Sequence, residues 1–284
     1  MNAADSVILQ SDIDKLMEWS RTWLLKFHPD KCVYMGIGYK NSPVIQKYLM
    51  DDHMLAVSDC EKDIGVHIDS NLQFDTHISK SINKANRIMG ITRRTFHTLN
   101  KANFCNIFKA LVRPHVEYGA PIWSPHLIKY KELVENVQRR ATKFIPGMYD
   151  LSYPERLRIL KLPTLAYRRI RGDMIQVYKM LCADPKEGGY DESLPNFLSI
   201  GSNHSYSLNK HPKYLPTLRW DKPIRKHCFS IRIRNIWNSL PTEVVMSKSV
   251  KSFEKALDNH WKDQPVLYDN FKADIDLKIN RYRT

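Results

Sequence analysis

The sequence predicts an α+β fold, in which a small antiparallel-sheet front lobe is followed by a mainly α-helical body. Short β-prone runs bounded by turn residues lie between residues 31 and 69, whereas apolar residues recur at helical spacing from Ile78 onward. The net charge changes at the same place, from −5 over residues 1–76 to +13 over residues 77–175. With 43% hydrophobic residues in 284, the chain has enough apolar material for a packed core and one or two domains.

The front lobe comprises residues 1–76 and is predicted to begin with an amphipathic helix. This helix should end near His28 and Pro29, because the residue before a proline disfavours the helical conformation. The apolar positions at helical spacing are Leu9, Ile13, Leu16, Met17 and Leu24, and the pattern includes Trp19 and Trp23.

Short strands are predicted to follow this helix. Residues 31–38 form one β-prone run, and residues 44–49 and 54–57 are the arms of a predicted hairpin. Asp51 and Asp52 lie between the arms, where aspartate is typical of a turn. Residues 62–69 form a further predicted strand, in which Gly65 indicates a bend or bulge.

The body comprises residues 77–183 and is predicted to be helical. Apolar residues recur at helical spacing in residues 78–89, 104–113 and 130–145. Pro114 should end the second helix, because its ring removes a backbone donor and clashes with the preceding turn. In the third helix, Tyr130, Leu133, Val134, Val137, Ala141, Phe144 and Ile145 share one side, and Arg139, Arg140 and Lys143 share the other.

Basic residues are concentrated in this body. Residues 77–175 hold 19 Lys and Arg against 6 Asp and Glu. Such a field attracts a polyanion, although the solvated helix faces of any basic protein would give the same composition. If the partner is nucleic acid, the residues expected to contact it are Lys80, Lys84, Arg87, Arg93, Arg94, Arg113, Arg139, Arg140 and Lys143.

The remaining sequence predicts a further helical region after a linker. Ile170, Met174, Val177, Tyr178 and Leu181 recur at helical spacing, and then residues 184–224 are rich in Gly, Pro, Ser and Asn, which is typical of a linker or long loop. Residues 225–284 form a predicted C-terminal helical region, with helices over 229–237 and 250–261 and a frayed tail after residue 265.

Composition disfavours several classes of protein. The sequence has no apolar run of about 18 residues, and its first residues lack the pattern of a signal peptide. The 5 cysteines are widely spaced without a C-x-x-C pair, so neither structural zinc nor a disulfide framework is expected. We therefore expect an intracellular protein, nuclear or cytoplasmic, with no membrane, metal or small-molecule ligand; the oligomeric state is left open.

Several motifs occur in one order along nearly the whole chain. In the front lobe they are LQSDIDKL (9–16) with Trp19 and Trp23, FHPDKC (27–32) and KDIGV (62–66). In the body they are LVRPHVEY (111–118), IWSP (122–125), VQRRATKFIPG (137–147), YPERL (153–157) and LPTL (162–165), followed by Tyr167, Arg168 and Arg169. Phe229, Ser230, WNSLP (237–241) and residues 249–261 complete the set. Together these motifs resemble the late palm, thumb and C-terminal region of reverse transcriptases from non-LTR (LINE-type, jockey-like) retrotransposons.

The resemblance implies the end of a polymerase palm over residues 1–76 and a thumb-like region over residues 77–183. In the family, the aspartates that hold Mg²⁺ precede the segment that begins at Leu9, so we expect this chain to carry neither the cofactor nor polymerase activity. Lys31 matches a lysine with a general-acid role, although a surface lysine at a helix end would look the same. Gly65 and Val66 match the strand that cradles the primer end.

These implications lead to three hypotheses about function. The first is a truncated RNA-directed DNA polymerase that binds RNA or an RNA–DNA hybrid by shape and phosphate. The second is a helical scaffold or protein-interaction module without nucleic-acid function. A nuclease ranks last, because the C-terminal sequence offers no clustered carboxylates at metal-binding spacing. The Asp51-Asp52 pair is not a candidate metal site, because it follows the Lys31 motif, whereas the metal site of the family precedes that motif.

Overall fold

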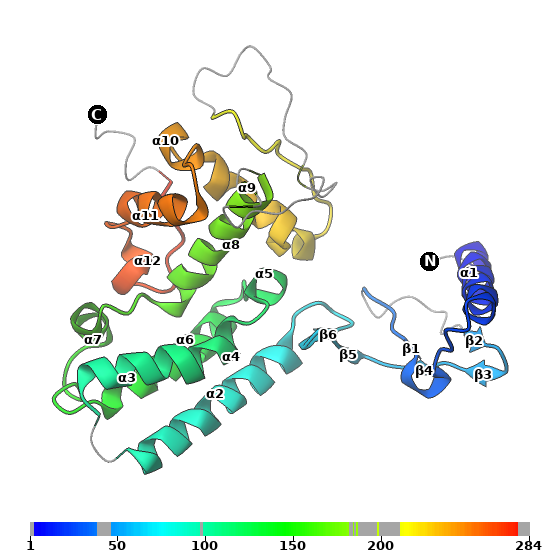
Figure 1. Cartoon of the computed structure of the whole chain (residues 1–284), viewed down its shortest axis with the longest axis horizontal. Helices are drawn as coiled ribbons and strands as arrows, with labels where there is room; N and C mark the ends of the chain where they lie inside the picture. Colours follow the sequence, from blue (N-terminus) through cyan, green and yellow to red (C-terminus); the bar gives the residue numbers. More distant parts are fainter. Residues whose placement is uncertain are drawn as a thin grey trace. The chain divides into compact units, whose positions relative to one another are not determined.

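The chain has a mixed α+β fold that divides into two compact units, residues 1–77 and residues 78–284 (Figure 1). The computed structural model describes residues 3–38, 47–96, 99–181, 184, 186, 198 and 211–277. Within these residues, all the strands lie in the first unit and most helices in the second. The α+β class expected from the sequence is therefore confirmed, whereas the palm and thumb assignments stay predictions.

The first unit is built on helix α1 (Ala3–Thr22) and short strands. Its core contains Met17 of α1 together with Tyr48, Met50 and Leu55. The Gln10 side chain also joins α1 to strand β2 (Leu49–Met50), because its amide both donates to the Leu49 carbonyl at 2.9 Å and accepts from the Leu49 amide at 3.0 Å. One apolar side of α1 thus packs on the strands.

Helix α1 differs from its predicted extent. It ends at Thr22 rather than near His28, and a 3-10 turn (Pro29–Lys31) follows. Trp23 is 65% exposed and Leu24 is 83% exposed, with a positive φ of 56° at Leu24 that is incompatible with helix continuation. The predicted apolar side was therefore too wide, since the core takes up Leu9, Ile13 and Met17 but leaves Leu16, Trp19, Trp23 and Leu24 in solvent.

The strands of the described part of the chain form three two-stranded ladders. Strand β2 pairs antiparallel with β3 (His53–Met54), and Asp51 and Asp52 form the turn between them, so the predicted turn is confirmed. Strand β1 (Val33–Tyr34) pairs with β4 (Ala56–Val57) in parallel, which the sequence analysis did not predict. Residues 39–46, which include part of one predicted hairpin arm, lie outside the described residues.

The third ladder corrects the prediction for Gly65. Strand β5 (Cys60–Asp63) pairs antiparallel with β6 (Val66–Asp69), and Asp63 is opposite Val66. Residues 62–69 are therefore two strands, with Ile64 and Gly65 as the two-residue hairpin turn. Their φ angles of 42° and 85° explain the turn, because a tight hairpin of this twist requires positive φ at both central positions.

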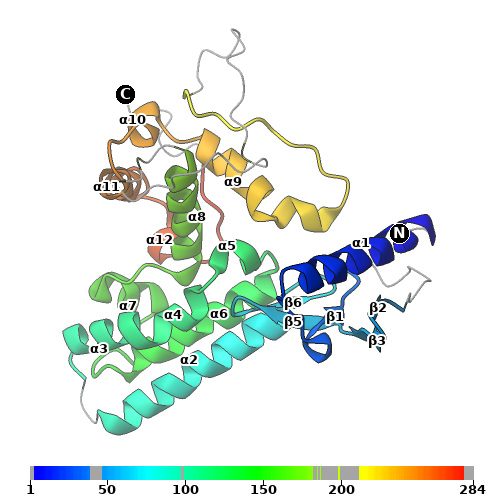
Figure 2. The ribbon, with the colours of Figure 1, turned by 45° about the vertical axis from the view of Figure 1, so that its right-hand side comes forward.

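The second unit begins with the long helix α2 (Asp75–Thr95), whose first residues lie at the boundary between the units. Helices α3 (Lys101–Ile107), α4 (Arg113–Glu117), α5 (Ala120–Trp123), α6 (Ile128–Ala141) and α7 (Tyr153–Leu160) follow. Both views show α2 running beside α3 and α6 (Figures 1 and 2). The helices predicted over 78–89 and 130–145 are confirmed, except that α6 ends at Ala141 and a 3-10 turn (Thr142–Phe144) continues it.

Pro114 does not end its helix, contrary to the prediction. A π-helical turn (Phe108–Val112) lies between α3 and α4, and the Arg113 amide donates to the Phe108 carbonyl five residues earlier. Pro114 then occupies the first turn of α4, where a missing backbone donor has little effect. The wider π turn accommodates the proline ring, and the chain continues in the helical conformation.

The rest of the second unit packs around helix α8 (Leu165–Leu181). Helices α9 (Phe229–Asn238) and α11 (Val250–His260) both contact α8, with α10 (Thr242–Val245) and α12 (Pro265–Tyr268) beside them. Trp237, Phe253, Leu257 and Trp261 are fully buried between them. The helices predicted over residues 170–181, 229–237 and 250–261 are thus confirmed.

Parts of the predicted linker and of the predicted frayed tail are held by hydrogen bonds and packing. In the predicted linker 184–224, residues 211–224 are described, and Asn238 exchanges hydrogen bonds of 2.9 and 2.8 Å with the Leu215 backbone. In the predicted frayed tail, Val266, Phe271 and Ile275 are buried, and Gln264 exchanges two hydrogen bonds of 2.9 Å with the Asp276 backbone. Residues 265–277 are therefore packed rather than frayed, which the irregular spacing of their apolar residues did not indicate. Most of residues 182–210 and residues 278–284 lie outside the described part.

Candidate nucleic-acid interface

Helix α2 carries a row of basic residues along its exposed side. Lys80, Lys84, Arg87 and Arg94 are exposed and lie in one row with Ile91, at intervals of four, three, four and three residues. At 3.6 residues per turn, this spacing keeps all five side chains within a narrow arc of the helix. We call these four cations the α2 row.

The opposite side of α2 is apolar and fixes the helix in place. Ile78 and Ala85 are 0% exposed and Met89 is 5% exposed, so this side is buried. Asp75, in the first turn, is the only acidic residue of the helix. Within the described part of the chain, Lys84, Arg87 and Arg94 form no ion pair. The α2 row is therefore a cationic surface on a helix whose one carboxylate, Asp75, lies in its first turn.

A groove lies beside the C-terminal ends of α2 and α6. Its volume is about 640 Å³, and its lining includes Arg93 of α2, Arg140 of α6 and Lys143 of the following 3-10 turn. None of the described residues that line it is acidic. The structure thus brings together three of the predicted phosphate-binding residues that are far apart in the sequence. We call this feature the α2–α6 groove.

Exposed aromatic residues lie among these cations. Arg93 Cζ is 4.9 Å from the centroid of the Phe144 ring, and Lys143 Nζ is 5.1 Å from that of Tyr149. Phe96, Phe144 and Tyr149, which also line the groove, are 46%, 38% and 70% exposed. From the sequence, Phe144 was predicted on the packing side, and neither Phe96 nor Tyr149 was predicted as a site residue. Phe96 lies three residues after Arg93, and Tyr149 lies two residues after Gly147. This closeness to the predicted basic motifs could have identified both rings.

Arg139 is not part of this surface, contrary to the prediction. It is partly buried, and its Cζ is 5.2 Å from the ring centroids of both Tyr153 and Phe271. Its Nη1 donates to the Asn136 side chain at 2.7 Å. The prediction placed Arg139 with Arg140 and Lys143, but the helix ends at Ala141, and adjacent helical residues point about 100° apart. Arg139 therefore contacts α7 and the C-terminal segment.

Arg113 is likewise engaged inside the second unit. Its side chain is 17% exposed and forms an ion pair with Glu117 at 3.5 Å, and Glu117 also accepts two hydrogen bonds from Arg168. Burial and then the nearby Arg168 lower the pKa of Arg113, whereas Glu117 opposes this shift. A cation held in such a network is poorly placed to meet a phosphate, so we remove Arg113 from the candidate interface.

Glu135 of α6 fixes the orientation of that helix against α8. Its carboxylate is 0% exposed and accepts hydrogen bonds from the Tyr153 hydroxyl at 2.5 Å and from the Leu165 and Ala166 amides at 3.2 and 3.3 Å. These amides lie at the N-terminus of α8, where the helix dipole favours negative charge. Burial nevertheless raises the pKa of Glu135, and the Tyr153 hydrogen bond opposes that shift.

The predicted site residues of the first unit lie on different elements, Lys31 at the 3-10 turn and Gly65 and Val66 in the β5–β6 hairpin. Lys31 is exposed at the end of the 3-10 turn. Gly65 is in the β5–β6 turn, and Val66 of β6 is buried, with 2% exposure. Across the described ranges, no group of three His, Cys, Asp or Glu residues could hold a metal ion, and no helix is long and apolar enough to cross a membrane.

The fold and the surface together define a two-unit α+β protein whose helical second unit has a cationic side with exposed aromatic residues. In comparisons with family models, curated proteins and solved structures, no match to this chain was found. The resemblance to reverse transcriptases therefore rests on the sequence motifs alone.

Proposed function

We propose that the second unit binds structured RNA or an RNA–DNA hybrid through backbone phosphates, with little preference for base sequence. The α2 row carries this proposal. With a rise of 1.5 Å per residue, Lys80 and Arg94 are separated by about 21 Å along the helix, a length that spans several base-pair steps of a duplex. A row of cations on a rigid helix suits contacts to phosphates, which position a duplex without reading its sequence.

The α2–α6 groove extends this surface. Its three cations can neutralise further phosphates, and its exposed aromatic rings offer stacking surface to unpaired bases. A duplex with a single-stranded extension would use both features. The motif resemblance supports the same function, because the thumb of a reverse transcriptase holds a primer–template duplex by its backbone. We accordingly propose a non-copying, nucleic-acid-binding role related to that thumb.

The direct test compares two triple variants of equal charge change. In the first, Lys84, Arg87 and Arg94 of the α2 row become Ala; in the second, Lys251, Lys255 and Lys262, which are exposed in or just after α11, become Ala. Fluorescence anisotropy with several RNA duplexes and hybrids of unrelated sequence measures binding. We expect the α2 variant to lose at least about tenfold in affinity on all sequences, while the control loses far less.

Folding must be monitored in the same experiment. Alanine favours helix formation and the buried side of α2 is unchanged, so the circular dichroism spectrum of the α2 variant should match that of the parent. Equal losses in both triple variants would indicate a general charge effect. Equal affinity of the parent and the α2 variant would favour the alternative function, a helical scaffold.

A further inference from the structure

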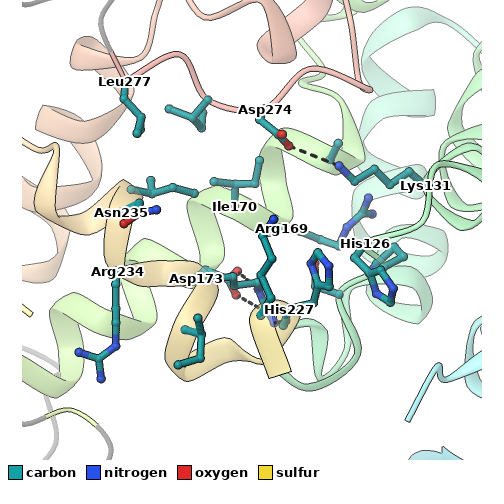
Figure 3. A pocket seen from close by; sticks show the side chains of 18 of the residues that line it. His126, Lys131, Arg169, Ile170, Asp173, His227, Arg234, Asn235, Asp274 and Leu277 are labelled. Carbon is teal, nitrogen blue, oxygen red and sulfur yellow. Dashed lines mark hydrogen bonds and ion pairs between the residues drawn. The ribbon is translucent and has the colours of Figure 1, made fainter. Parts of the chain in front are cut away.

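A second basic cavity lies between α8, α9 and the C-terminal segment of the second unit. Its volume is about 500 Å³, a size that fits small-molecule ligands. Arg169 and Asp173 of α8 lie at its centre, His126 and His227 at one side, and Asp274 and Leu277 at another (Figure 3). The α2 row contributes no residue to this cavity, which is therefore separate from the proposed nucleic-acid interface.

The cavity contains positive charge that its own carboxylates do not neutralise. Asp173 is paired with Arg232 through contacts of 2.9 and 3.0 Å, and Asp274 is paired with Lys131 at 3.5 Å. No ion pair in the described part of the chain includes Arg169 or Lys226, which also line the cavity. These two cations remain for a ligand.

Arg169 is the unusual group. Its residue is only 4% exposed, yet its buried Nη1 has no hydrogen-bond partner among the described residues. An unpartnered guanidinium donor in the interior is costly, because it has lost its hydration without gaining an acceptor. Burial lowers the pKa of Arg169, and the charges of Glu135, Glu117 and Asp173 oppose that shift without a hydrogen bond to Nη1. An anion in the cavity would satisfy this donor.

Flat aromatic groups line the same cavity. The His126 and His227 rings are stacked, with centroids 4.1 Å apart and planes 11° apart. Burial lowers the pKa of both imidazoles; Lys131 lowers that of His126 further, and the neighbouring His126 and then Lys226 lower that of His227, so both rings are uncharged near neutral pH. Trp220 is 41% exposed, and Lys226 Nζ lies 5.7 Å from the centroid of its ring. A ligand with a planar ring could stack here while its anionic group reaches Arg169.

We propose that this cavity binds a nucleotide, with the phosphate at Arg169 and Lys226 and the base against the aromatic wall. Arginine suits this role, because its planar donors match phosphate oxygens and the contact is strong where water is excluded. The nucleotide could be free or could belong to a nucleic-acid strand, since both carry the same phosphate and base.

The test is calorimetric titration of the full chain with adenosine 5′-monophosphate, adenosine and inorganic phosphate. We expect the monophosphate to bind at least about tenfold tighter than either part alone, because charge-assisted phosphate contacts and stacking both contribute. Equal binding of adenosine would overturn the phosphate contact. Equal binding of inorganic phosphate would overturn the assignment to nucleotides. Absence of binding at millimolar monophosphate would overturn the whole proposal.

Variants separate this cavity from the rest of the molecule. Lys226→Ala should weaken monophosphate binding by about tenfold, whereas the control Lys222→Ala, which is exposed and outside the cavity, should not. Arg169→Met, which keeps an unbranched side chain without the buried donor, should abolish binding. Arg169 is interior, so Arg169→Met could fail to fold. In that case the comparison of Lys226→Ala with its control Lys222→Ala decides the outcome. Unchanged affinity in Lys226→Ala would overturn the proposal.

Two further arms complete the design. The triple Ala variant of the α2 row should bind the monophosphate as tightly as the parent, so that failure of this proposal and failure of the nucleic-acid interface are distinguishable. A short single-stranded oligonucleotide that competes with the monophosphate would identify a strand as the source of the nucleotide. Lack of competition would identify a free nucleotide, and either result supports the site provided that the monophosphate binds.

Discussion

Arg139 and Arg140 are consecutive in the sequence, yet the fold gives them different environments. Arg139 lies over the Tyr153 and Phe271 rings, whereas Arg140 lines the α2–α6 groove. Arg139→Ala should therefore lower the free energy of unfolding by about 1–2 kcal/mol through lost packing and cation–π contact, with little effect on RNA affinity. Arg140→Ala should instead weaken RNA binding, with little effect on the free energy of unfolding. Urea unfolding and anisotropy on both variants measure this, and equal effects of the two substitutions would contradict the assignment.

Glu135 predicts an unusual dependence of stability on pH. Burial raises its pKa above the value of 4.5 that applies in the unfolded chain, so the folded protein binds the proton more tightly. The stability that Glu135 contributes is therefore full below that value and falls as pH rises through the raised pKa. Glu135→Gln has no carboxyl group to titrate and lacks this dependence.

The measurement is urea unfolding of the parent and Glu135→Gln at about pH 4 and about pH 7. We expect the stability of the parent relative to the variant to decrease with rising pH. The comparison cancels the other carboxylates, which titrate in both proteins. A relative stability that increased with pH would mean that the hydrogen bonds from Tyr153, Leu165 and Ala166 outweigh desolvation at this site.

At the scale of elements, the β5–β6 hairpin has an unfavourable residue in its turn. Ile64 is β-branched, 84% exposed, and held at a φ of 42°, a conformation that such residues rarely adopt. Ile64→Asn would create an Asn-Gly turn and should stabilise the hairpin by about 0.5–1 kcal/mol. Gly65→Ala, at a φ of 85°, should destabilise it by a similar amount. Hydrogen exchange of the β5 and β6 amides in the full chain reports both changes, and equal exchange in the two variants would contradict the turn geometry.

The α2–α6 groove should discriminate between ends of nucleic acid. Tyr149 is 70% exposed and lies beside Lys143, so an unpaired base can stack on its ring. Tyr149→Ala should weaken binding of a duplex with a single-stranded extension by about 1–3 kcal/mol and leave binding of the blunt duplex nearly unchanged. Anisotropy with the two ligands measures the difference. An equal loss on both would show that the ring contributes to folding or to duplex contacts instead.

Elements with regular periodicity could be predicted from the sequence, and irregular ones could not. Ile78, Ala85 and Met89 recur at helical spacing, and α2 forms as expected. Pro114 did not break its helix because a π turn, which has no local sequence signature, absorbs the strain. Val266, Phe271 and Ile275 were missed because their burial depends on tertiary contacts with α8 and α11 rather than on spacing.

The candidate site was predictable only in part for a related reason. Composition and spacing identified the α2 row, because exposure on a long helix follows from the burial of its opposite side. They did not distinguish Arg113 or Arg139 from free surface cations, since their partners, Glu117, Phe271 and Tyr153, are assembled by the fold. The basic cavity beside α8 draws residues from five separate segments, a combination that no local pattern could reveal.

At the scale of the whole molecule, charge is divided between segments with different properties. Residues 1–76 have a net charge of −5, whereas residues 77–175 have +13 and residues 176–284 have +6. The positive potential therefore belongs to the second unit, and the α2 row and the α2–α6 groove contribute exposed cations to it. A polyanion should be attracted to this unit rather than to the first.

The central claim is that exposed cations on α2 neutralise phosphates, and the salt dependence of affinity tests it most directly. If about six cations of the α2 row and groove each neutralise one phosphate, the slope of log affinity against log salt for an RNA–DNA hybrid should be about −5. The Lys84, Arg87 and Arg94 triple Ala variant should have a slope shallower by about two to three units, while the α11 control should keep the slope of the parent. A flat slope for the parent, or identical slopes for the parent and the α2 variant, would contradict the proposed interface.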